Sequence, residues 1–231
     1  MKCIAIIPAR GGSKRLPRKN ILPLHGEPLL SRVVKTCIKA GCFDEVVVST
    51  EDAEIASIAE NAGARVHCRP ESIAGDRSTV VDVCLDVLNS VEAEVFCCVY
   101  ATSALLHHDT LLESFKKLVK TKDINVLMGV SEYQHSPFQA LLVEDSGRVE
   151  LLHPEYHGVQ SQFYPKVRVS NGTFYWARRA TFLEEETFYS KKLGVYDVPD
   201  SEVCDLDTQD DFDRLLRLYD EGKCFESRLS N

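Results

Sequence analysis

The chain has 231 residues, a length typical of one domain that buries a full core without disulfides or a structural metal. Its net charge of −8 argues against a nucleic-acid partner, because counterion release from phosphate backbones needs a broad basic surface. No apolar run approaches the ~20 residues of a membrane-spanning helix, so we expect no membrane association.

The nine cysteines do not form a recognisable framework. Their number is odd, no two have CxxC spacing, and several lie within apolar runs. This usage is typical of reduced, buried thiols, and it predicts a cytoplasmic protein. The first residues begin a predicted strand and have no signal-peptide pattern, which favours the same location.

The first half of the chain alternates buried strands with amphipathic helices. Continuous apolar runs predict strands that are covered on both faces, and apolar residues recurring every three or four positions predict helices. A capping-box pattern predicts the helix starts at Thr79 and Thr110. In chain order, we expect a strand at 3–7, a helix at 28–41, a strand at 45–49, a helix at 52–61, a strand at 65–68, a helix from 79, a strand at 94–100, a helix at 110–119 and a strand at 126–130.

The second half has shorter strands and a less regular pattern. Segments 140–144 and 149–152 predict a hairpin, because a turn-forming Asp-Ser-Gly separates them. We interpret the stretch at about 131–200 as an insertion that covers the site or pairs with a second subunit. Strands at 173–177 and 195–198 and a helix at 208–219 are also predicted.

Strands separated by helices of 10–15 residues predict βαβ units. We therefore expect residues 1–231 to form one α/β domain, with a Rossmann-like, open and mostly parallel sheet flanked by helices. In such sheets, ligands bind where the carboxyl ends of the strands meet the loops that follow.

The loop after the first strand, residues 8–20, carries the strongest functional signal. Gly11 and Gly12 let backbone N–H groups approach phosphate oxygens, and cations neutralise the phosphate charge. Each charge-assisted hydrogen bond contributes ~1.5–3 kcal/mol. The loop therefore predicts binding of a nucleoside triphosphate, although its spacing matches neither GxxxxGK[ST] nor GxGxxG. The alternative is a solvated basic loop. The five cations are Arg10, Lys14, Arg15, Arg18 and Lys19.

Asp205 and Asp207 form a second candidate site. Alternate residues of an extended segment face the same side, so the two carboxylates are able to converge on one Mg²⁺, which prefers oxygen ligands. The alternative is that Asp207 caps the helix predicted from Thr208.

Five segments, in order, resemble the cytidylyltransferases that activate nonulosonic acids, the CMP-sialic acid synthetase family. They are 4–20 (IAIIPARGGSKRLPRKN), 46–52 (VVVSTED), 69–76 (RPESIAGD), 171–175 (NGTFY) and 205–208 (DLDT). The resemblance extends over almost the whole chain. It implies the fold of nucleotide-diphospho-sugar transferases.

The resemblance also implies a reaction, in which CMP passes from CTP to the anomeric hydroxyl of a nonulosonic acid and pyrophosphate leaves. Such transfer depends on positioning and charge neutralisation. Mg²⁺ is the implied cofactor, and the implied partners are the two small-molecule substrates and a second copy of the chain in a homodimer.

The family motifs assign roles to particular residues. The implied catalytic residues are Arg10, Lys14, Lys19 and Asp207. The implied CTP-binding residues are Arg10, Gly11, Gly12, Ser13, Lys14, Lys19, Asn20, Arg69, Asp76 and Thr102. Apart from these motif assignments, we expect the sugar to be recognised by polar residues in the stretch from 100 to 177, namely Tyr100, Ser103, Gln139, Gln162, Arg168 and Asn171. The expected metal ligands are Asp205 and Asp207.

Departures from the usual family pattern indicate a branch. Arg15 after Ser-Lys, Tyr100 in place of the first residue of QPTSP, and Gln139 are similar to the pseudaminic acid branch. Asn171 is closer to the sialic pattern, so CMP-N-acetylneuraminate and CMP-legionaminate synthetases are alternatives. More distant alternatives are a nucleotidyltransferase for a Kdo-like acid, a nucleotide-sugar-dependent glycosyltransferase that releases no pyrophosphate, and a non-catalytic nucleotide-binding regulator.

Overall fold

The apolar runs of the sequence form the strands of one central sheet in the computed structural model, which describes residues 1–229, with side chains described through 222. The strands of the sheet are β1 (Cys3–Pro8), β4 (Glu45–Thr50), β5 (Arg65–Cys68), β6 (Val95–Val99), β7 (Val126–Ser131), β10 (Val169–Arg178) and β11 (Leu193–Asp197). The helices are α1 (Leu29–Ala40), α2 (Ala53–Asn61), α3 (Val80–Ser90), α4 (His108–Lys120), α5 (Arg179–Glu185) and α6 (Gln209–Leu229). A two-stranded ribbon, β2 (Pro23–Leu24) and β3 (Glu27–Pro28), precedes α1.

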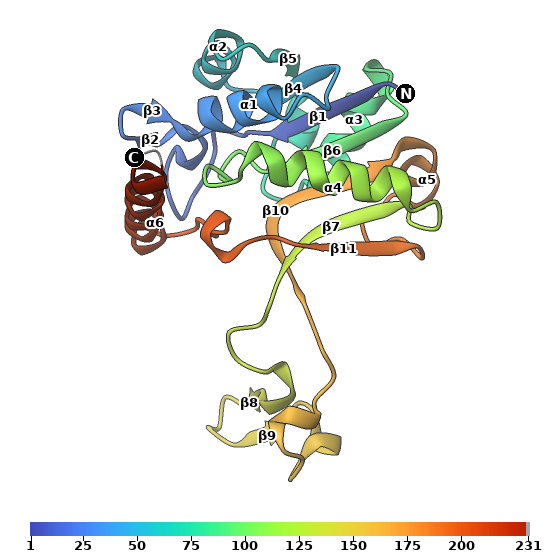
Figure 1. Cartoon of the computed structure of the whole chain (residues 1–231), viewed down its shortest axis with the longest axis vertical. Helices are drawn as coiled ribbons and strands as arrows, with labels where there is room; N and C mark the ends of the chain where they lie inside the picture. The colour runs from blue at the N-terminus through green and yellow to red at the C-terminus, as the bar shows by residue number, and fades with distance from the viewer. Residues whose placement is uncertain (230–231) are drawn as a thin grey trace.

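The seven strands lie in the order β11-β7-β10-β6-β1-β4-β5 (Figure 1). β10 is antiparallel to both of its neighbours, and the other pairs are parallel. The predicted α/β class with a mostly parallel sheet is confirmed. The insertion of an antiparallel strand between β6 and β7 was not predicted.

Alternate side chains of the central strands pack on opposite faces of the sheet. In β1, Ala5 and Ile7 join one buried cluster, whereas Ile4 and Ile6 join another. Helices α1, α2 and α4 contribute to the first cluster, and α3 and α5 contribute to the second. The helices therefore cover both faces, and the carboxyl ends of the strands are left for a site.

One predicted helix start is wrong. The N-cap of α4 is His107, and the Thr110 hydroxyl instead donates to Glu202 Oε1 at 2.9 Å. The reason is that Thr110 lies inside the helix, where its hydroxyl faces another segment. The capping box predicted for Thr79 and Asp82 is confirmed.

The segment that leaves the sheet is shorter than the predicted insertion at 131–200. β10 and β11 are strands of the main sheet and α5 packs on it, so the segment that leaves the body of the domain is residues 132–168. We call this segment the arm. In Figure 1 it extends away from the sheet and ends in the predicted hairpin, formed by β8 (Leu141–Val143) and β9 (Val149–Leu151).

The described cysteines are all free thiols, and the side chain of Cys224 lies outside the described residues. None of the described helices has both the length and the apolar character needed to cross a bilayer.

Gly129 of β7 provides a test of how closely this strand packs against side chains of β10 and of the residue after β11. A Cβ there would lie 2.6 Å from Thr173 Oγ1 and 3.2 Å from a Val198 methyl, whereas a Cβ on Gly222 of α6 would meet no atom within 4 Å. We expect Gly129→Ala to lower the free energy of unfolding by about 1–3 kcal/mol.

The matched control, Gly222→Ala, is expected to raise the free energy of unfolding by about 0.5–1 kcal/mol, because alanine is the better helix former. Urea denaturation of both variants measures the difference. Equal effects of the two substitutions would contradict the packing argument.

Candidate active site

A cavity of about 910 Å³ lies at the carboxyl edge of the sheet. Its walls come from the basic loop after β1, the loops after β6 and β7, the start of β10 and the segment before α6. This is the edge at which the sequence analysis expected the site. The lining residues are Arg15, Lys19, Tyr100, Thr102, 131–134, 169–172, Tyr175, Asp200, 203–205, Asp207 and Arg214.

Two predicted CTP-binding cations converge on a carboxylate from a distant segment. Arg10 Nη1 lies 2.8 Å from Asp76 Oδ1, and the Lys14 ammonium pairs with the other oxygen of Asp76. Hydrogen bonds from Lys14 and Arg10 hold the pKa of Asp76 below its usual range. The structure thus brings together the first loop and the 69–76 segment, both of which the sequence analysis assigned to the nucleotide.

The other half of the loop meets the aspartate pair. Lys19 Nζ lies 3.2 Å from Asp207 Oδ1, and Arg15 Nη1 lies 2.9 Å from Asp207 Oδ2. Lys19 also donates to the Leu206 carbonyl at 3.1 Å. Asp205 and Asp207 both line the cavity, so residues from the two ends of the chain form one wall.

The start of α6 tests the interpretation that Asp207 caps the helix. The Asp211 carboxylate accepts from the Thr208 amide at 2.8 Å and from the Asp207 amide at 3.0 Å, and Thr208 Oγ1 accepts from the Asp211 amide at 3.3 Å. The capping pair is therefore Thr208 and Asp211, and the alternative in which Asp207 caps the helix is wrong. Hydrogen bonds from Thr208 and Asp207 lower the pKa of Asp211.

Asn20 and Arg69 are more deeply buried than expected for ligands. Asn20 Nδ2 donates to the Arg10 carbonyl at 2.9 Å, which links the two ends of the loop. Arg69 is 5% exposed and donates to the Ser49 carbonyl at 2.7 Å. Burial lowers the pKa of Arg69. In this arrangement both side chains bind protein atoms, and their contacts with CTP stay predictions.

The predicted sugar-binding residues divide into two groups. Tyr100 and Asn171 line the cavity, and Asn171 Nδ2 donates to Ser131 Oγ at 3.0 Å. Ser103 is buried just behind them and donates to the Thr173 carbonyl at 3.2 Å. These residues and Thr102 are thus at or beside the same cavity.

The structure does not bring the remaining three to the cavity. Gln139 lies in a short 3₁₀ turn of the arm, and Gln162, also in the arm, donates to Gln160. Arg168 lies at the base of the arm, where it pairs with Glu132 at 3.0 Å and with the Asp197 carboxylate.

Sequence reasoning missed Tyr175 as a cavity residue. Its hydroxyl lies 2.7 Å from Ser170 Oγ, and its ring meets the Tyr100 ring edge-on at 5.9 Å. The available signal was its position in the NGTFY motif. Its proximity to Tyr100 depends on β10 pairing with β6, which no local pattern reveals.

Comparisons with known proteins give a consistent result. The family described as Cytidylyltransferase matches residues 4–227. The chain is 32% identical to a pseudaminic acid cytidylyltransferase of Campylobacter jejuni, covering 95% of this chain and 97% of that protein. It is 30% identical to a CMP-N,N'-diacetyllegionaminic acid synthase of Legionella pneumophila, covering 96% and 99%. A solved CMP:2-keto-3-deoxy-manno-octonic acid synthetase complexed with CTP has a similar fold, with a TM-score of 0.73 and 16% identity, covering 96% of this chain and 100% of that one.

Asp211 provides a test of the helix cap that adjoins the aspartate pair. We expect Asp211→Ala to lower the free energy of unfolding at pH 7 by about 0.5–2 kcal/mol, because the amides of Asp207 and Thr208 lose their acceptor. Since the folded-state pKa of Asp211 is depressed, this contribution is present above the unfolded pKa and is lost as the pH falls through the folded pKa.

Urea denaturation at pH 7 and at about pH 3 measures both effects, because an unperturbed aspartate titrates near 3.9. The matched control is Asp213→Ala, at an exposed position of the same helix. If the free energy of unfolding of Asp211→Ala differed from that of the wild type by the same amount at pH 7 and pH 3, the role of the ionised carboxylate would be contradicted.

Proposed function

Because the chain belongs to the cytidylyltransferase family, we propose that it transfers CMP from CTP to the anomeric hydroxyl of a nonulosonic acid, pseudaminic acid being favoured. The family resemblance inferred from the five motifs is confirmed. The observation that carries the proposal is the meeting of Arg15 and Lys19 with Asp207 at one wall of a polar cavity. CMP-N-acetylneuraminate and CMP-legionaminate synthetases are the alternatives.

The reaction needs positioning and charge neutralisation. The anomeric oxygen attacks the α-phosphorus of CTP, the new C–O–P linkage forms, and the bond from the α-phosphorus to the bridging oxygen breaks. Pyrophosphate takes the electron pair of that bond, and the hydroxyl proton is released. Arg10, Lys14 and Lys19 would neutralise the triphosphate and the leaving pyrophosphate.

Asp205 and Asp207 have the chemistry of a magnesium site. Both are carboxylates that line the cavity, and Mg²⁺ in such enzymes is held by one or two carboxylates together with substrate phosphates. A bound Mg²⁺ would supply charge neutralisation at the phosphates. Occupancy of this site requires Asp207 to exchange its contacts with Arg15 and Lys19 for the metal.

The sugar half of the cavity is polar and aromatic. Tyr100, Tyr175 and Asn171 would contact the acceptor, with hydroxyl and amide groups that suit a polyhydroxy acid. Preference for pseudaminic acid is supported by the Campylobacter relative and by the branch features in the sequence.

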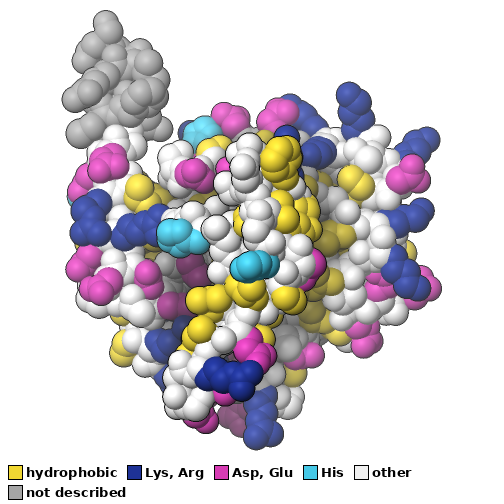
Figure 2. Space-filling view, turned by 90° about the horizontal axis from the view of Figure 1, so that it is seen from below, with side chains coloured by type: hydrophobic (Ala, Val, Ile, Leu, Met, Phe, Trp, Pro, Cys, Tyr) yellow, Lys and Arg dark blue, Asp and Glu magenta, His cyan; other side chains and the backbone are white. Residues whose placement is uncertain are grey.

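We propose a homodimer formed through the arm. Exposed apolar side chains gather on its hairpin, at Leu141, Leu142, Val143, Val149 and Leu151. Figure 2, which looks at the molecule from the tip of the arm, shows hydrophobic side chains at the centre of that face. A two-stranded hairpin is marginally stable alone, and such a patch usually marks an interface. In a dimer, Gln139 and Gln162 would approach the cavity of the second copy.

A cytoplasmic location is proposed from the described thiols. All of them are free, which suits a reducing compartment, and the substrates CTP and a free sugar acid are small soluble metabolites.

We expect Asp207→Asn to abolish pyrophosphate release while the protein stays folded. The amide keeps the shape of the side chain but removes the charge that a magnesium ion requires. The measurement is pyrophosphate release with CTP, Mg²⁺ and a panel of nonulosonic acids, which also identifies the sugar. The matched control is Asp213→Asn on the exposed face of α6. Full activity of Asp207→Asn would contradict the metal role, and wild-type inactivity with every acid would contradict the proposed function.

We expect Val143→Asp to convert the dimer into monomers, because a charge would enter the apolar interface. Val143 is 73% exposed in the single chain. Sedimentation velocity measures the change. The matched control is Tyr189→Asp, which adds the same charge at a 72% exposed residue outside the arm. Dimers that persist in Val143→Asp, or a wild-type monomer, would contradict the arm as the interface.

A further inference from the structure

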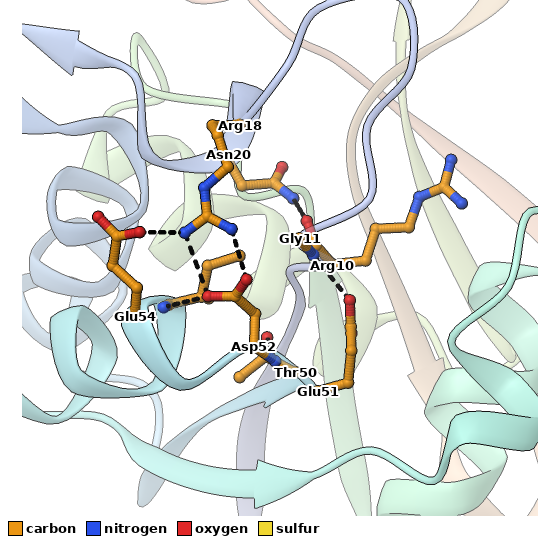
Figure 3. A network of polar contacts seen from close by, with 9 residues as sticks. Arg10, Gly11, Arg18, Asn20, Thr50, Glu51, Asp52 and Glu54 are labelled. Atoms are coloured by element: carbon orange, nitrogen blue, oxygen red, sulfur yellow. Dashed lines mark hydrogen bonds and ion pairs between the residues drawn. The ribbon is translucent and has the colours of Figure 1, made fainter.

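Arg18 differs from its neighbours in the basic loop because its guanidinium contacts helix α2 and Asp52, the residue directly before that helix. It pairs with the carboxylates of Asp52 and Glu54, and Arg18 Nη2 lies 3.2 Å from Asp52 Oδ1 (Figure 3). Arg15 and Lys19 line the cavity, whereas Arg18 is not among its described lining residues. In Figure 3 the Arg10 side chain extends away from this network.

Asp52 connects both ends of the loop to a rigid element. Its Oδ1 accepts from the Ile55 amide at 3.0 Å and so caps α2. A Cβ on Gly11 would lie 2.5 Å from Asp52 Oδ2, so the first turn of the loop packs directly against the same carboxylate that Arg18 holds. Hydrogen bonds from Arg18 lower the pKa of Asp52. The carboxylate is therefore ionised and fixed at neutral pH.

Other contacts close the loop in the same place. The Gly11 amide donates to Glu51 Oε1 at 2.8 Å, and Asn20 Nδ2 donates to the Arg10 carbonyl at 2.9 Å. Both contacts are drawn in Figure 3. The loop thus returns on itself beside the start of α2, with Asp52 between its two ends.

The backbone at Arg18 also needs this support. Its φ of 58° and ψ of 24° lie in the left-handed region, which a non-glycine residue rarely adopts. Such a conformation persists where the surroundings determine it. The next residue, Lys19, begins the short 3₁₀ helix Lys19–Ile21 and reaches Asp207 in the cavity. The conformation of Arg18 therefore sets the direction in which Lys19 points.

We propose that Arg18, Asp52 and Glu54 form a clamp that positions the phosphate-binding loop, and that Arg18 acts as a positioning residue without contacting CTP. The proposal rests on the cytidylyltransferase function proposed above. With the clamp intact, the loop is held in the binding geometry before CTP arrives, so little ordering remains to oppose binding. Without it, the loop relies on the Asn20–Arg10 and Gly11–Glu51 contacts to hold its two ends in place.

The test compares Arg18→Gln with Asp52→Asn. Asparagine caps a helix as well as aspartate does, so Asp52→Asn keeps the α2 cap but removes the charge and one of the two acceptor oxygens that Arg18 uses. We expect each variant to weaken CTP binding and raise KM for CTP about tenfold, with kcat changed less than about twofold. Because the two side chains form one interaction, we expect the double variant to lose no more CTP affinity than the single variant that binds CTP more weakly.

The outcomes separate the clamp from its alternatives. If Arg18 binds phosphate directly, Arg18→Gln weakens CTP binding but Asp52→Asn leaves it unchanged or tightens it, which would overturn the proposal. A fall in Tm in both variants with unchanged KM would also overturn it, because the network would then be structural only. Arg18→Lys, which keeps the charge but loses the forked contact, is measured as well. We expect it to weaken CTP binding less than Arg18→Gln, so the series is informative even where Arg18→Gln folds poorly.

The matched control is Lys116→Gln, which removes an exposed cation that pairs with Glu113 on α4, with a nitrogen–oxygen distance of 2.7 Å. It should leave KM and CTP affinity unchanged. Calorimetric CTP binding needs no acceptor sugar, so the clamp is tested independently of turnover. A wild-type protein that binds CTP but releases no pyrophosphate would contradict the proposed function alone, and the affinity series would still decide the clamp.

Discussion

Mutual repulsion among the five cations of the first loop is the constraint on which the site depends. The structure meets it with carboxylates from three other segments. Asp76 pairs with Arg10 and Lys14, Asp207 pairs with Arg15 and Lys19, and Asp52 with Glu54 pairs with Arg18. Each anchor comes from a different loop at the carboxyl edge of the sheet. The same pairs that neutralise the loop therefore also assemble the site from segments far apart in the sequence.

These anchors differ in how easily a ligand displaces them. Lys14 and Arg15 are 80% and 72% exposed, and ion pairs at such positions contribute only about 0–1 kcal/mol. A triphosphate, with more charge and several oxygens, is able to replace Asp76 and Asp207 as their partner at small cost. The Arg18 contacts are less exposed on the Asp52 side and are joined to a helix cap. The same loop therefore carries exposed ion pairs, at Lys14 and Arg15, and a less exposed pair at the start of α2.

Much of this arrangement was predictable from the sequence because it depends on local signals. The buried strands, the hairpin of the arm and the basic loop at the end of β1 were all found from periodicity and composition. What could not be found depends on pairing between distant segments. The antiparallel β10 places Tyr175 beside Tyr100, and Thr208 with Asp211, rather than Asp207, caps α6. Gln139 and Gln162 were assigned to the sugar as polar residues of the irregular second half, yet neither is among the described cavity-lining residues.

The position of β10 links the arm to the cavity. β7 ends at Ser131 and β10 begins at Val169, and the arm connects these two points. The flanking residues, 131–134 and 169–172, are themselves cavity walls, so the base of the arm and the proposed sugar half of the site share the same backbone. Arg168 braces this base through Glu132 and Asp197. A contact on the arm therefore acts on the backbone that carries Ser131 and Asn171, whereas the proposed nucleotide half is anchored on β1 and α2.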